Sequence, residues 1–232
     1  MEASNQKSSE WYEARLGKFT SSELSKLLTS GRAKDQEFGD TALSYIKEKL
    51  HEHFTKGTCL DYGFQGNKAT EWGEHFEPEA RDLYSEMTGY LVTECGFIQS
   101  QESEMFGGSP DGLVGEDGLI EIKCPYASNH VEHLTLKTAQ DLQASKKEYF
   151  AQCQGNLLAT GRKWCDFVSY DPRYQNPLFR MKILRVERDE EFIAMAIDKI
   201  KKAEKVFEMM LEGIINGQLE LSRKLKSTVE AI

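Results

Sequence analysis

The stretch over residues 107–125, GGSPDGLVGEDGLIEIKCP, constrains the fold more than any other part of the chain. It predicts two short strands joined by a tight turn at residues 115–118, because glycine tolerates positive φ and Asp-Gly is a strong hairpin signal. Successive side chains of a strand point to opposite faces. The second strand, LIEIKC, therefore places Glu121 and Lys123 on one face and its two isoleucines with Cys124 on the other.

Asp111 lies ten positions before Glu121, across the predicted hairpin, and can approach the same point. Two carboxylates and a lysine that converge from paired strands suit a hard divalent cation and an anionic substrate. Mg²⁺ prefers oxygen ligands and takes one or two carboxylates together with phosphate oxygens. A metal-bound water loses its proton more easily, and Lys123 would orient that water or neutralise charge on the phosphate.

The competing interpretation is a surface hairpin on which Glu121 and Lys123 form an exposed pair that adds little stability. The Ser-Pro-Asp-Gly sequence upstream of the strand, at this spacing, favours the catalytic interpretation.

The composition fits one soluble domain of 232 residues, with 39% hydrophobic and 29% charged residues. No apolar run approaches the roughly 18 residues of a membrane span, and the first residues lack the apolar core of a signal peptide. Five scattered cysteines without a Cys-x-x-Cys pair indicate reduced thiols in a cytoplasmic setting and argue against zinc or iron–sulfur ligation. A net charge of −9 would repel a polyanion at long range, so nucleic-acid binding would depend on a local basic lining.

We predict a single α/β domain over residues 1–232, with a central mixed sheet flanked by helices on both sides. Residues 1–10 are expected to be flexible, Pro78 is expected to kink its helix, and a polar loop after Pro125 carries His130 and His133. Helices are predicted near residues 22–28, 40–50, 69–89, 145–161 and 190–232, and strands at residues 90–99, 164–171 and 178–186.

Two further side chains outside the hairpin are candidates for substrate contact. Arg15 precedes the helix predicted near Ser22, where it is either a surface residue or a phosphate clamp assisted by backbone N–H groups. Gln152 carries both a donor and an acceptor, which suit a phosphate, a base or a metal-bound water.

Seven short pieces, in this order and spacing, resemble the lambda exonuclease family of phage recombination nucleases, within the restriction-endonuclease-like PD-(D/E)xK superfamily. The resemblance covers most of the chain from Trp11 to about Glu190. The pieces are W-Y-E-A-R-L-G (11–17), S-S-E (21–23), W-G-E-H-F-E (72–77), S-P-D-G-L (109–113), E-I-K-C-P (121–125), A-Q-C-Q (151–154) and Y-D-P-R (170–173).

The resemblance implies a restriction-endonuclease-like core and a Mg²⁺-dependent 5′→3′ exonuclease, with Mn²⁺ expected to substitute. Such an enzyme degrades one strand of linear double-stranded DNA to 5′ mononucleotides and leaves a 3′ single-stranded tail for recombination by strand annealing. The resemblance further implies a homotrimeric ring around DNA, a single-strand annealing protein as partner, no membrane, and a phage or prophage protein in the cytoplasm of a bacterial host.

Site roles follow from the same resemblance. It implies that Asp111, Glu121 and Lys123 are catalytic, and that the two carboxylates bind the metal. The remaining assignments are Glu77 and the carbonyl of Ile122 as further metal ligands, and Arg15, Ser22, Ser109 and Gln152 as residues that hold the 5′ phosphate and the DNA. Pro78 departs from the family sequence beside Glu77.

Two alternatives stay open. One is another PD-(D/E)xK endonuclease of the restriction or junction-resolving type, which the hairpin alone does not distinguish, although Arg15 favours an exonuclease. The other is a non-catalytic DNA-binding scaffold, which the intact Asp111, Glu121 and Lys123 set disfavours.

Overall fold

A five-stranded sheet lies at the centre of the fold, in the strand order β2-β5-β6-β7-β8. The computed structural model describes residues 6, 8–31, 33, 36–57 and 68–230, so most of the predicted flexible segment 1–10 lies outside it. Only β6 and β7 of this sheet pair in parallel, and its other neighbours are antiparallel. The predicted mixed sheet is therefore confirmed. Its strands are β2 (Val92–Thr93), β5 (Gly112–Val114), β6 (Gly118–Lys123), β7 (Trp164–Tyr170) and β8 (Met181–Glu187).

Strands β5 and β6 form the predicted hairpin, with Gly112 opposite Ile120 and Val114 opposite Gly118. Gly115 in the turn has φ +53°, which a residue with a side chain adopts only under strain. The alternation of side chains is also as predicted, because Leu119 and Ile120 enter two different core clusters.

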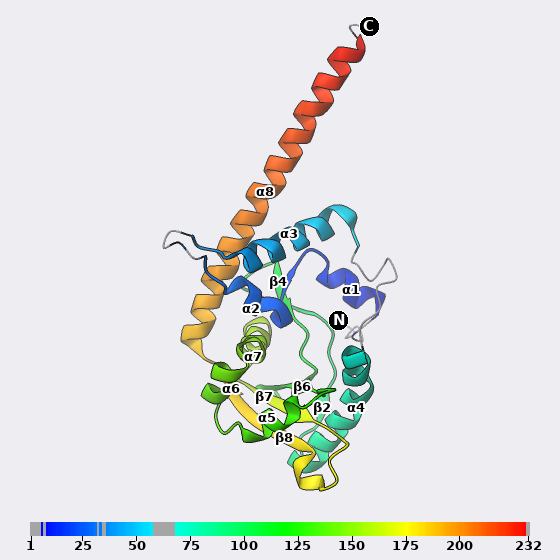
Figure 1. The fold of residues 1–232 in the computed structure, drawn as a ribbon, viewed down its shortest axis with the longest axis vertical. Coiled ribbons are helices and arrows are strands. Elements are labelled where there is room, and N and C mark those ends of the chain that lie inside the picture. Colours follow the sequence, from blue (N-terminus) through cyan, green and yellow to red (C-terminus); the bar gives the residue numbers. More distant parts are fainter. Residues whose placement is uncertain (1–5, 7, 32, 34–35, 58–67, 231–232) are drawn as a thin grey trace.

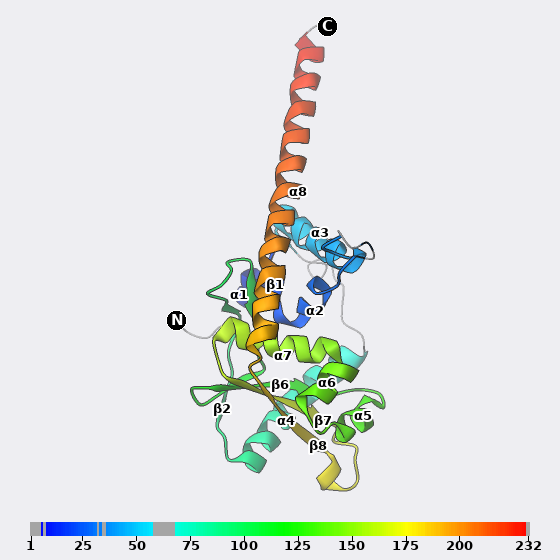
Figure 2. The same cartoon turned by 90° about the vertical axis from the view of Figure 1, so that its left-hand side faces the viewer.

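Helices cover both faces of this sheet, as predicted (Figures 1 and 2). On one face α4 (Lys68–Thr88) packs Ala80 and Tyr84 against the isoleucines of β6. On the other face α6 (Ala139–Ser145) and α7 (Lys147–Thr160) bury Leu142 and Leu157 against Leu119. Helix α4 continues through Pro78 as one helix.

A second core lies beyond α7, around a three-stranded sheet of order β1-β4-β3. Long helix α8 crosses this part and extends away from the rest of the fold (Figure 1). Among the described residues, none of the helices is long and apolar enough to cross a membrane. The elements of this part are α1 (Ser9–Arg15), β1 (Phe19–Thr20), η1 (Ser21–Glu23), α2 (Leu24–Leu27), α3 (Asp40–Thr55), β3 (Ile98–Gln99), β4 (Phe106–Gly108) and α8 (Glu190–Glu230).

Two local predictions were wrong. The single strand expected at residues 90–99 is two strands in different sheets, because the chain between β2 and β3 passes from one sheet to the other. The expected polar loop after Pro125 contains helix α5 (Asn129–Thr135), in which His130 and His133 are fully buried. Both rings hydrogen-bond the Ser169 hydroxyl of β7, at 2.8 and 2.7 Å, and this partner makes their burial possible.

Candidate active site

Asp111, Glu121 and Lys123 meet where β5 begins and β6 ends. The antiparallel register brings Asp111 beside β6, where its Oδ2 accepts a hydrogen bond of 2.6 Å from the Ile122 backbone N–H. The Lys123 Nζ lies 2.8 Å from Glu121 Oε1 on the same face of the strand. The hairpin therefore assembles the two carboxylates and the ammonium, as the sequence predicts.

The electrostatics of this cluster favour a bound cation. Burial and the nearby Glu121 raise the pKa of the Asp111 carboxyl to about 7, and burial also raises the pKa of the Glu121 carboxyl. Burial alone would lower the pKa of Lys123, but Glu121 and Asp111 hold it above its usual range. The buried Glu121 and the partly buried Asp111 share one ammonium, so the cluster carries more negative than positive charge when both carboxyls are ionised. An additional cation would stabilise these ionised forms.

Helix α7 supplies two amides to the same cluster. The Gln152 side-chain oxygen accepts from Lys123 Nζ at 2.9 Å. The Asn156 Nδ2 donates to Glu121 Oε2 at 2.8 Å, and both side chains are buried. Each Glu121 oxygen thus has a donor, and the carboxylate is held in one orientation.

Glu77 reaches the site from α4, but its carboxylate pairs with Arg81 at 2.6 Å, and Arg81 also pairs with Glu94. Within the described parts of the chain, no three His, Cys, Asp or Glu side chains are grouped closely enough to hold a metal ion. The donor set at Asp111 and Glu121 fits a divalent cation. Glu77 and the Ile122 carbonyl stay predictions as further ligands.

Arg15 and Ser109 form a second polar group next to the carboxylates. Arg15 is the last residue of α1, a helix that the sequence analysis did not predict. Its guanidinium donates to Ser109 Oγ at 3.1 Å and stacks over the Trp11 ring at 4.3 Å. The Trp11 indole N–H donates to the same hydroxyl at 2.9 Å. Burial lowers the pKa of Arg15, although an arginine stays charged at neutral pH.

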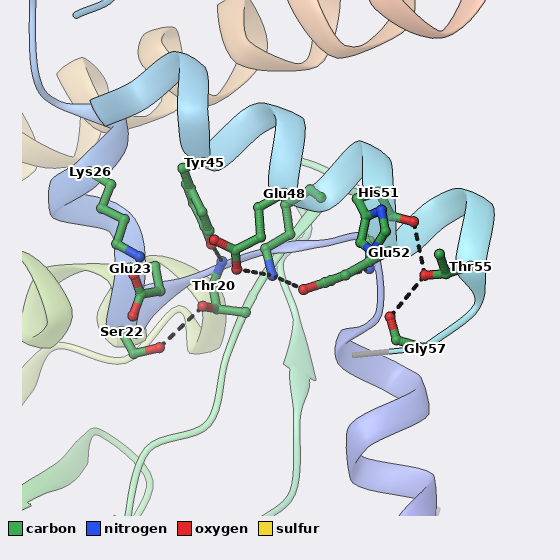
Figure 3. A network of polar contacts seen from close by, with 12 residues as sticks. Thr20, Ser22, Glu23, Lys26, Tyr45, Glu48, His51, Glu52, Thr55 and Gly57 are labelled. Atoms are coloured by element: carbon green, nitrogen blue, oxygen red, sulfur yellow. Dashed lines mark hydrogen bonds and ion pairs between the residues drawn. The ribbon is translucent and has the colours of Figure 1, made fainter. Parts of the chain in front are cut away.

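Ser22 lies in the 3₁₀ turn η1, where its hydroxyl is 3.1 Å from Thr20 Oγ1 (Figure 3). The Thr20 backbone N–H donates to the Tyr45 hydroxyl at 3.0 Å, which fastens this turn to α3. In the same view Glu52 projects from α3, and its carboxylate accepts from Lys49 at 2.6 Å and from the Gly17 backbone at 2.9 Å. The turn that carries Ser22 is therefore fixed against α3.

One cavity of about 620 Å³ connects these groups. All of the predicted site residues line it, although they come from six separate stretches of chain. They are Arg15, Ser22, Glu77, Ser109, Asp111, Glu121, Ile122, Lys123 and Gln152.

Three residues around this cavity have no role that was predicted from the sequence. Asn156 had no signal, because an asparagine inside a helix shows its partner only when the fold is known. Trp11 is part of the recognised W-Y-E-A-R-L-G piece, and its spacing of four from Arg15 is that of neighbours on a helix. Tyr149 lies under Lys123, with Nζ 5.2 Å from the ring centroid.

Comparison with known proteins agrees with this architecture. Residues 10–163 match the model of the YqaJ-like viral recombinase domain. The structure of an alkaline exonuclease, LHK-Exo from Laribacter hongkongensis, is 34% identical with a TM-score of 0.79, over 92% of this chain and all of that one. The same values hold for LHK-Exo in complex with dAMP.

A phage-related exonuclease from Haemophilus somnus 129PT shares the fold at 19% identity and a TM-score of 0.69, over 85% of this chain and 96% of that one. A search of curated proteins finds no match. These findings confirm the resemblance to phage recombination exonucleases and the restriction-endonuclease-like fold. The chain belongs to the YqaJ-like viral recombinase family.

Proposed function

We propose that this protein is a Mg²⁺-dependent 5′→3′ exonuclease of the PD-(D/E)xK type that degrades one strand of linear double-stranded DNA. The observation that carries the proposal is one cavity in which Asp111, Glu121 and Lys123 lie beside the Arg15–Ser109 pair. Family membership and the likeness to an alkaline exonuclease support nuclease activity. The complex of the related LHK-Exo with dAMP supports a mononucleotide product.

The residues divide the work of phosphodiester cleavage. Asp111 and Glu121 would hold Mg²⁺, with Mn²⁺ as a substitute, and the bound ion would supply Lewis acidity at the scissile phosphate. Asn156 and Lys123 fix the two Glu121 oxygens. The Lys123 ammonium, which Gln152 also holds, is placed to stabilise charge that develops on the phosphate.

Arg15, Ser109 and Ser22 would bind the terminal 5′ phosphate. A terminal phosphate carries more charge than an internal diester, so hydrogen bonds from the partly buried Arg15 guanidinium would favour chain ends over the interior of DNA. Each cut creates a new 5′ phosphate, which would draw the strand forward by one nucleotide. This arrangement supports release of 5′ mononucleotides and a growing 3′ single-stranded tail.

A homotrimeric ring would explain how a chain of net charge −9 stays on DNA, since encirclement replaces long-range attraction. The exposed 3′ tail would then pass to a single-strand annealing protein of the phage.

The two alternatives to this function are a restriction or junction-resolving endonuclease of the same superfamily and a non-catalytic scaffold.

One experiment separates these candidates. Linear duplexes with 5′-phosphate or 5′-hydroxyl ends, and covalently closed circles, are incubated with Mg²⁺, Mn²⁺ or EDTA. We expect mononucleotides from the 5′-phosphorylated strand with either metal, slower release from the hydroxyl end, and intact circles. Cut circles would indicate an endonuclease, and no cleavage in any arm would indicate a scaffold.

A separate measurement tests the homotrimer. Light scattering should give a mass of about three times the chain mass of 26.4 kDa.

Matched variants assign the residues. Lys123→Ala and Glu121→Gln should each lose about 10²–10³ in rate, the usual cost of removing one positioned electrostatic group. Arg15→Ala should slow cleavage from the 5′-phosphorylated end more than from the 5′-hydroxyl end. The ratio of the two rates should therefore be smaller than in the wild type. An unchanged ratio in Arg15→Ala would remove Arg15 from the phosphate site.

A further inference from the structure

One aromatic residue that lines the active-site cavity, Tyr126, has no role in the fold or in the chemistry proposed above. Tyr126 follows Lys123 by three residues and lines the same cavity. The residue is 46% exposed, so its ring is accessible to a ligand in the cavity. The exposed aromatic residues Phe54, Tyr90 and Phe179 do not line this cavity.

Tyr126 is held from behind by a stacked pair of side chains. The Trp72 ring of α4 meets the Tyr126 ring edge-on, with centroids 5.7 Å apart and an interplanar angle of 71°. The Arg173 guanidinium lies over the Trp72 ring, 4.5 Å from its centroid. This edge-to-face and cation–π packing restricts the tyrosine to a small range of orientations.

A buried carboxylate fixes the arginine in turn. Asp171 accepts two hydrogen bonds from the Arg173 guanidinium, at 2.8 and 2.7 Å, and is itself buried. The same guanidinium donates to the Pro125 carbonyl at 3.3 Å, directly before Tyr126. The Y-D-P-R piece of the sequence therefore braces the loop that presents Tyr126 to the cavity.

The strand order places Arg173, which holds the loop of Tyr126, on the opposite side of β6 from the Arg15–Ser109 pair. Ser109 leads into β5 on one side of β6, and Arg173 follows β7 on the other. Glu121 and Lys123 lie on β6 between them. A strand whose terminal phosphate sits at Arg15, and whose first internucleotide phosphate sits at Lys123, would carry its second nucleotide towards Tyr126.

We propose that Tyr126, braced by Trp72 and Arg173, is a stacking subsite for the nucleobase of the second nucleotide, the one that becomes the new 5′ end after each cut. Stacking is tolerant of sequence because every base has a π face, which suits an enzyme that removes nucleotides of any identity. It also holds the unpaired strand in place before the bond is cut. The inference rests on the exonuclease function proposed above.

The test compares 5′-phosphorylated duplexes that carry either a normal nucleotide or an abasic residue at position 2, in single-turnover release of nucleotide 1. Base–aromatic stacking contributes roughly 5- to 150-fold in affinity. We therefore expect the wild type to release nucleotide 1 from the abasic duplex more slowly, by a factor in that range. Tyr126→Ala should be slow on the normal duplex and indifferent to the abasic residue. Tyr126→Trp should restore the sensitivity. Tyr90→Ala, which removes a tyrosine of similar exposure outside the cavity, should behave as the wild type.

A binding measurement keeps this inference separate from the proposed function. With Ca²⁺ in place of Mg²⁺, 2-aminopurine at position 2 should be quenched by the wild type and by Tyr90→Ala, and much less by Tyr126→Ala at saturating protein. If the wild type cleaves normal and abasic duplexes equally, or if Tyr126→Ala quenches fully, the subsite is refuted while the nuclease stands. If no duplex is cleaved but the quenching depends on Tyr126, the proposed function fails and the base-stacking site remains.

Discussion

Replacement of Asn156 by leucine should separate the stability of the protein from its catalysis. Leucine keeps the branched shape of asparagine but exchanges both amide groups for methyls. The Asn156 Nδ2 donates to Glu121 Oε2 at 2.8 Å, with both side chains buried. Within the described chain, Asn156 Oδ1 is buried without a hydrogen-bond partner. The same amide therefore contains one stabilising and one destabilising group.

The two effects of the substitution on folding nearly cancel. Loss of a hydrogen bond to a charged group destabilises by about 1.5–3 kcal/mol, and removal of an unsatisfied buried acceptor returns about 1–3 kcal/mol. We expect the free energy of unfolding to change by less than about 1.5 kcal/mol. Catalysis has no such compensation, because Glu121 keeps a donor on one oxygen only, and a misplacement of about 1 Å costs up to about 10²-fold in rate.

Urea unfolding followed by circular dichroism gives the stability, and single-turnover cleavage of a 5′-phosphorylated duplex gives the rate. Gln154→Leu is the matched control, since Gln154 is also buried in α7 but both of its amide groups are bonded, to Glu187 and Asp189. That variant should lose about 2–5 kcal/mol and keep its rate at temperatures where it is folded. An Asn156→Leu protein that loses more than about 3 kcal/mol, or cleaves at the wild-type rate, would refute this account.

Two further predictions concern stability. Burial lowers the pKa of His133 to about 4, below the unfolded value of about 6.5, so the unfolded chain binds the proton first. The stability that neutral His133 contributes is complete above about pH 6.5 and is lost as the pH falls towards 4, by up to about 3 kcal/mol. The urea midpoint of His133→Gln should therefore fall less on acidification than that of the wild type. Asp166→Asn should lower the free energy of unfolding by about 2–3 kcal/mol, since buried Asp166 accepts from Arg185 at 2.5 Å and from the Tyr84 hydroxyl at 2.7 Å; a urea midpoint equal to that of the wild type would contradict it.

The central hairpin could be predicted from the sequence because its determinants are local. The turn glycines, the alternation along residues 119–124 and the position of Asp111 all act within about fifteen residues. Local signals also gave the start of α3 at Asp40 and the end of α4 before Gly89, which has φ +73°.

The parts that could not be predicted depend on contacts between distant segments. His130 and His133 appear polar in the sequence, and only the Ser169 hydroxyl of a strand far along the chain makes their burial favourable. The ion pairs of Arg81 with Glu77, one turn away on α4, and with Glu94 beyond the helix were not predicted either, because a helix carboxylate can face solvent, a metal or an arginine. Local sequence decides which residues a strand or helix contains, and tertiary packing decides what they contact.

The carboxylates of the active site come from one hairpin, whereas the residues that complete it come from α1, η1, α4 and α7. A partly synthesised chain could already contain Asp111, Glu121 and Lys123, but not yet the α7 amides at residues 152 and 156. Until α7 packs, the Glu121 carboxylate lacks its Asn156 donor and one wall of the cavity is missing. Assembly of the site therefore depends on completion of the fold, because the hairpin alone holds the carboxylates but not the α7 side chains that orient them.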